Sequence, residues 1–170
     1  MNIVKGTEHW DGTTALDFCY DDGGRRAAGY QGPTGDCVTR AIAIATGLPY
    51  GEVYRTINTI ASLTERIGKR KRSKSNARTG VYKGTQHKYL AAIGWRWHPT
   101  MHIGSGCKVH LLKGELPMGR LIVSVSRHLT AVIDGVIHDT HDPTRATLWF
   151  DTDGGKRMSH RCVYGYWTKE

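Results

Sequence analysis

The segment that decides the fold reads Gln31-Gly32-Pro33-Thr34-Gly35-Asp36-Cys37, and the mostly apolar run 38–46 follows it. Apolar side chains recur in this run at the spacing of one helix face, at Val38, Ala41, Ile42 and Ala45. Asp36 is a suitable N-cap, and Gly47-Leu48-Pro49 ends the pattern. The sequence therefore predicts a helix over 37–46 that begins at a cysteine.

The rest of the chain predicts helices first and an antiparallel sheet second. Two more helices are expected, over 52–62 and from an N-cap at Thr85 to 93. Short β-branched runs predict strands over 15–20, 121–126, 128–133, 136–140 and 162–167. Asp134-Gly135 predicts a two-residue hairpin turn between the third and fourth of these strands. The fold class is therefore α+β, in one domain over 1–170 with a basic loop at about 65–80.

Composition excludes several classes of protein. The chain has 170 residues, of which 39% are hydrophobic, and no window of 18 apolar residues that would predict a membrane-spanning helix. The first residues lack the apolar core of a signal peptide, so we expect a cytoplasmic protein without a membrane partner. Without a CxxC pair, its four cysteines are expected to be free thiols: Cys19, Cys37, Cys107 and Cys162.

The net charge of +9 is concentrated in the run 66–78, which holds no acidic residue. Such a run is typical of a solvated loop that repels itself. It could also contact nucleic acid or an acidic protein. The residues expected to make that contact are Lys69, Arg70, Lys71, Arg72 and Lys74.

The position of Cys37 predicts a reactive thiol. The N-terminus of a helix carries a partial positive charge and unpaired N–H groups, which lower the pKa of a thiol and can bind an oxyanion. A thiol nucleophile also needs a base within hydrogen-bonding reach, and the base needs a partner that orients it.

The predicted hairpin supplies both groups. A turn at Asp134-Gly135 pairs Thr130 with Asp139 across the two strands. The same register pairs His128 with His141. Because side chains alternate between the faces of a sheet, these four side chains project to the same side. Asp139 is then a diagonal neighbour of His128 and can hold its imidazole in one orientation.

The glutamine, the cysteine and the later histidine strand resemble the papain-like cysteine peptidases. The match lies in Gln31-Gly32-x-x-Gly35-x-Cys37 and in the run 128–132 with its following aspartate. It is closest to the compact bacterial peptidases that process double-glycine leaders and to short phage proteins of this type. The resemblance implies that Cys37 is the nucleophile and that His128 is the general base and acid. It implies that Asp139, with Asp142 as the alternative, orients the histidine. Gln31 would then donate to the oxyanion together with the N–H of Cys37.

The resemblance also implies an activity. Such an enzyme cleaves peptide, isopeptide or amide bonds through a thioester and needs no cofactor, while deamidation and acyl transfer stay open. Its substrate is a protein or peptide, with Gly35, Asp36 and Arg127 as the expected contacts. A phage-encoded enzyme of this type would act in the host cytoplasm.

Two alternatives remain on the sequence alone. One is a basic protein that binds nucleic acid or a host factor without an active site, in which Trp95-Arg96-Trp97 would stack on bases. The other is a structural zinc site at Cys107 and His110, with further ligands from His138, His141, Asp142, His160 and Cys162. No second close cysteine pair is present, so no metal is predicted.

Overall fold

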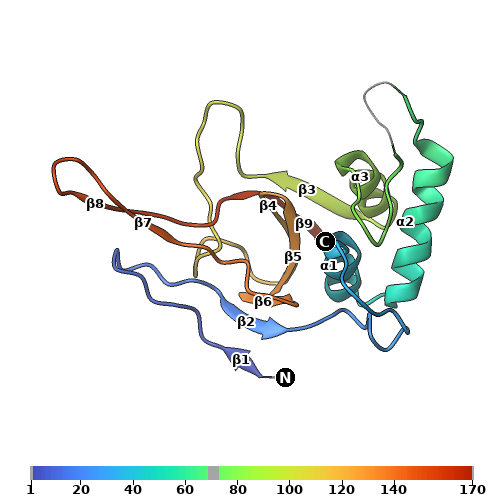
Figure 1. Cartoon of the computed structure of the whole chain (residues 1–170), viewed down its shortest axis with the longest axis horizontal. Coiled ribbons are helices and arrows are strands. Elements are labelled where there is room, and N and C mark those ends of the chain that lie inside the picture. Colours follow the sequence, from blue (N-terminus) through green and yellow to red (C-terminus); the bar gives the residue numbers. More distant parts are fainter. Residues whose placement is uncertain (1, 69–72, 170) are drawn as a thin grey trace.

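The computed structural model describes residues 2–68 and 73–169, which form helices packed on a seven-stranded sheet and a separate hairpin (Figure 1). The helices are α1 (Cys37–Thr46), α2 (Tyr50–Thr64) and α3 (Lys83–Ala92). The strands are β1 (Ile3–Val4), β2 (Asp17–Tyr20), β3 (Trp95–Pro99), β4 (Arg120–Val125), β5 (His128–Ile133), β6 (Val136–Asp139), β7 (Thr147–Phe150), β8 (Lys156–Ser159) and β9 (Val163–Lys169). The predicted α+β class is confirmed.

Helix α1 has the predicted bounds. Its C-cap is Gly47, whose φ of 74° lies in the left-handed region that suits glycine. The Asp36 side chain makes no capping hydrogen bond. Helix α3 begins before Thr85, so the prediction of an N-cap there is wrong. Thr85 is buried inside the helix, where its hydroxyl donates to the buried carboxylate of Glu65.

The sheet has the strand order β1-β2-β6-β5-β4-β9-β3. Ile133 pairs with Val136 and Ala131 with His138, which confirms the predicted hairpin and its register. The turn residue Asp134 has a positive φ of 48°, as the two-residue turn requires. Strand β2 pairs in parallel with β6, a contact between distant segments that the sequence did not predict.

Apolar side chains cover both faces of the sheet. On one face α1 packs against β4, β5 and β6, and the core there includes Ile42, Leu90 and Ile122. On the other face Leu111 and Val123 belong to a second apolar cluster. This packing fixes the first turn of α1 against the end of β5, which positions Cys37.

Cys107 and Cys162 form a disulfide, so the prediction that they are free thiols is wrong. They are 55 residues apart in sequence, but an isolated β-bridge between His110 and Cys162 brings the two segments together. Cys19, which is buried, and Cys37 remain free. The pairing also removes Cys107 and Cys162 as zinc ligands, because a disulfide sulfur carries no thiolate charge.

Strands β7 and β8 form a hairpin that extends away from the sheet, on the side opposite the helices (Figure 1). The sequence analysis did not predict it. All four residues of β7 are exposed, so no buried face produces the alternation that reveals a strand. Among the described residues, no helix has the length and apolar character needed to span a membrane.

Candidate active site

Cys37 is the first residue of α1, and it lies at the wall of a cavity of about 520 Å³. At this position the first N–H groups of the helix have no partner within it. The thiol is partly buried. The cavity is lined by residues from α1, α3, the adjoining ends of β4 and β5 with their turn, the segments 34–35 and 79–81, and the residue 141 that follows β6: Thr34, Gly35, Cys37, Val38, Arg40, Thr79, Gly80, Val81, Lys83, Gln86, Ser124, Val125, Arg127, His128, Leu129 and His141.

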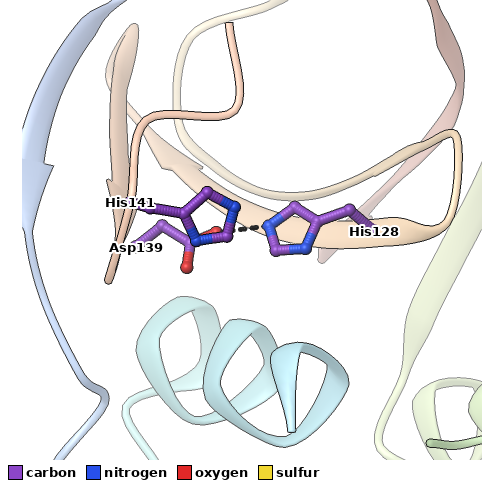
Figure 2. Close-up of side chains that lie close together, drawn as sticks. All are labelled: His128, Asp139 and His141. Carbon is purple, nitrogen blue, oxygen red and sulfur yellow. Dashed lines mark hydrogen bonds and ion pairs between the residues drawn. The ribbon is translucent and has the colours of Figure 1, made fainter. Parts of the chain in front are cut away.

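His128 and Asp139 are hydrogen-bonded across the β5–β6 hairpin (Figure 2). His128 Nε2 lies 2.7 Å from Asp139 Oδ2, and His128 lines the same cavity as Cys37. Because Nε2 is occupied by Asp139, Nδ1 is the ring nitrogen that remains for a second partner.

Asp142, the alternative partner of His128, is exposed, and its Oδ1 accepts hydrogen bonds from the N–H and hydroxyl of Thr144. The carboxylate of Asp139 is buried, with a side-chain exposure of 4%. The geometry therefore favours Asp139 as the residue that orients His128.

The electrostatics of the three side chains favour a charged pair. Burial of the thiol raises the pKa of Cys37, but the hydrogen bond with His128, the Leu129 N–H and the charges of His128 and Arg40 together lower it. Burial lowers the pKa of His128, but its bonds to Asp139 and Cys37 raise it to about 9. Burial raises the pKa of Asp139, and the bond and charge of His128 more than offset this, so it is lowered. The pKa shifts of all three groups thus favour their charged forms: thiolate, imidazolium and carboxylate.

A buried ion cluster supports this arrangement from α1. Arg40 Nη2 lies 3.4 Å from Asp139 Oδ1, and its other nitrogen is paired with Asp36. Asp36 also pairs with Arg25 at 3.1 Å and accepts a hydrogen bond from the Tyr50 hydroxyl at 2.5 Å. The Asp36 side chain is fully buried in this cluster and does not line the cavity. We therefore assign it a structural role in place of the predicted substrate contact.

Some of the other predicted site residues line the cavity and some do not. Gly35 and Arg127 line the cavity, so their role as substrate contacts stays a prediction. Gln31 is exposed and does not line it, and among the described residues its hydrogen bonds are those that its backbone carbonyl accepts from Arg25 and Arg78. Gln86 lines the cavity instead, with one Nε2 hydrogen bond to a backbone carbonyl. No sequence pattern indicated Gln86, because it comes from a helix 49 positions after Cys37 in the chain.

The basic loop is only partly described. Lys69, Arg70, Lys71 and Arg72 lie outside the described residues. Lys74 donates to the backbone carbonyl of Ser62 at 2.6 Å. The C-terminal end of the loop is bound to the nucleophile segment, since the Arg78 carbonyl accepts from the N–H of Gly35 and from the Thr34 hydroxyl.

A metal site is the other chemistry that these residues could support. The side chains of His128, Asp139 and His141 offer ligand atoms that lie within 4.8 Å of one another (Figure 2). Asp139, however, already accepts bonds from His128 and from the Thr140 N–H, and the Arg40 guanidinium next to it repels a cation. The donor set therefore suits a proton-transfer pair better than a metal ion.

Comparisons with known proteins add no family to this geometry. No protein-family model, no curated protein and no solved structure matches the chain.

Proposed function

We propose that the chain is a cysteine hydrolase in which Cys37 is the nucleophile, His128 the general base and acid, and Asp139 the orienting carboxylate. The observation that carries the proposal is the hydrogen bond between His128 and Asp139 beside a cavity that both Cys37 and His128 line. Helix α1 and the distant β5–β6 hairpin supply a thiol, an imidazole and a carboxylate, which are the groups that a cysteine nucleophile requires.

In the proposed reaction, the Cys37 sulfur attacks the carbonyl carbon of the substrate and forms a C–S bond. The carbonyl oxygen becomes an oxyanion, next to the unpaired N–H groups of the α1 N-terminus. The C–N bond then breaks as the His128 imidazolium gives its proton to the leaving amine. Water hydrolyses the thioester, with His128 accepting the proton from water and the sulfur leaving as a thiolate.

These features favour a papain-like enzyme. Its elements are a nucleophile at the start of a helix, followed in the chain by a histidine on a strand and an aspartate on the neighbouring strand. The same groups also serve deamidation and acyl transfer, because all three reactions pass through a thioester. The role expected of Gln31 in binding the oxyanion is better suited to Gln86, whose amide lines the cavity.

Alkylation by iodoacetamide as a function of pH tests the proposal. Cys37 and the buried Cys19 are the free cysteines, so intact mass counts at most two adducts and the cysteine variants assign each one. We expect one adduct to form fast well below pH 8, and Cys37→Ala and His128→Ala to abolish this fast phase. Cys19→Ala is the matched control and should retain it.

A second measurement tests acyl transfer itself. Incubation with p-nitrophenyl acetate should give an acetylated protein that Cys37→Ala does not form. Slow alkylation of Cys37, with the pH dependence of an ordinary thiol, would contradict the proposal. Binding of nucleic acid that is indifferent to Cys37→Ala but sensitive to salt would then favour the basic binding protein.

A further inference from the structure

The charged side chains around the candidate nucleophile are of one sign. The described residues that line the cavity include Arg40, Lys83 and Arg127 but no aspartate or glutamate. Arg40 is buried and already paired with two carboxylates. Lys83 and Arg127 are exposed, and neither has an acidic partner within the described part of the chain. Two uncompensated positive charges therefore face the cavity.

The backbone holds one of these charges beside the imidazole. Arg127 directly precedes His128 in the β4–β5 turn, and its φ of 56° lies in the left-handed region, which is uncommon for a residue with a side chain. Lys83 lines the same cavity from the start of α3. Burial is the largest cause that lowers the pKa of the neighbouring His87, and the positive charge of Lys83 lowers it further. Both cations therefore line the cavity that a ligand of Cys37 would enter.

A second cavity of about 380 Å³ continues the first, since both are lined by Lys83, Gln86 and Ser124. Its far end is apolar and aromatic, lined by Trp97 and Met101 among others, and no described lining residue is acidic. The two cavities form one groove that is cationic beside Cys37 and apolar farther along.

We propose that this groove selects acidic peptide segments, with a carboxylate side chain next to the bond attacked by Cys37 and an apolar side chain farther along. This inference rests on the proposed function. Opposite charge favours a carboxylate near Lys83 and Arg127, and burial against Trp97 favours an apolar group. A nucleic acid would also fit the charge, but it has no acyl carbon for the thiolate to attack, so a peptide accounts for the cations and the nucleophile together.

Three matched irreversible probes test this inference: acetyl-Leu-X-vinyl methyl sulfones in which X is Glu, Gln or Lys. Intact mass gives the rate at which each labels Cys37. We expect the Glu probe to react faster than the isosteric Gln probe, by roughly fivefold for each of the two cations at low salt. The preference should shrink in 1 M NaCl.

Variants locate the source of the preference. Lys83→Gln and Arg127→Gln should each lower the Glu-to-Gln rate ratio by roughly fivefold, and charge reversal of both to Glu should favour the Lys probe. Lys88→Gln is the matched control, because Lys88 is an exposed lysine of the same helix that does not line the groove. It should keep the wild-type ratio.

The outcomes separate this inference from the proposed function. Fast alkylation of Cys37 by iodoacetamide, with no preference for the Glu probe, would overturn the acidic-substrate inference and leave the nucleophile intact. Slow alkylation would overturn both. Protection of Cys37 by an oligonucleotide, where an equal concentration of polyglutamate gives none, would assign the groove to nucleic acid.

Discussion

Replacing Asp139 by Asn removes the negative charge that supports the His128 imidazolium but keeps an oxygen that can accept the Nε2 hydrogen bond. The two side chains are 2.7 Å apart, and the bond to Asp139 is the largest effect that raises the pKa of His128. We expect the variant to lose the imidazolium at a lower pH than the wild type. Without that partner, the Cys37 thiolate should also form at a higher pH.

The magnitude follows from the pKa of His128, which lies at about 9 in place of its ordinary 6.5. That difference corresponds to roughly 3 kcal/mol, because one pH unit equals about 1.4 kcal/mol. Asp139 and Cys37 both contribute, and Asp139 contributes more, so its share is at least roughly 1.5 kcal/mol, or about one pH unit. A fall of the His128 pKa by about one unit should lower the imidazolium fraction about twofold at pH 8 and about tenfold well above pH 9.

The assay combines an NMR titration of the His128 imidazole with the pH dependence of iodoacetamide alkylation, which reports the Cys37 thiolate. In the wild type the imidazolium should be lost near pH 9, and alkylation should slow on the acid side below the lowered pKa of Cys37. In Asp139→Asn the pH at which the imidazolium is lost should fall, and the pH at which the Cys37 thiolate forms should rise. Asp142→Asn is the matched control and should leave them in place, because that carboxylate is bound by Thr144. Unchanged pH values in Asp139→Asn would refute the assignment.

Three further substitutions test the packing that holds the site. Gly165→Ala should destabilise the chain by about 1–3 kcal/mol in urea unfolding, because a Cβ there would lie 2.3 Å from the Trp97 ring. Gly84→Ala is the control, because a Cβ at Gly84 would meet no atom within 4 Å, and it should not destabilise the chain. Equal stability of the two variants would contradict the contact with Trp97. Asp36→Asn should cost about 3–5 kcal/mol, since it leaves buried cations uncompensated, and an unchanged melting temperature would argue against the ion cluster. Cys107→Ser should cost about 2–5 kcal/mol by releasing a cross-link across 55 residues, and an unchanged denaturation midpoint would show that the disulfide does not constrain the chain.

Much of the local structure could be predicted because it depends on short-range chemistry. Helix α1 and the β5–β6 hairpin follow from apolar spacing and from a turn pair that favours positive φ. The prediction of Thr85 as a cap failed, because its hydroxyl instead satisfies a buried glutamate from another segment. Local hydrogen-bonding preference gave way to tertiary packing there.

Contacts between distant segments account for what the sequence did not reveal. The disulfide, the parallel pairing of β2 with β6 and the cluster around Asp36 each join segments that carry no local mark of their partner. The same holds for the groove, since the position of Gln86 at the cavity depends on how α3 packs against α2 and β3.

The sequence by itself determined which residue types stand at the start of a helix and on adjacent strands, because helical period, strand alternation and turn geometry are local properties. From these it placed Asp139 beside His128 before any tertiary contact was known. Only the tertiary structure decided that Cys37 and His128 line one cavity, that Arg40 and Asp36 form a buried ion cluster with Asp139, and that Lys83 and Arg127 line the groove without an acidic partner among the described residues. Those features depend on packing a helix onto a sheet, where burial and charge act between residues far apart in the chain.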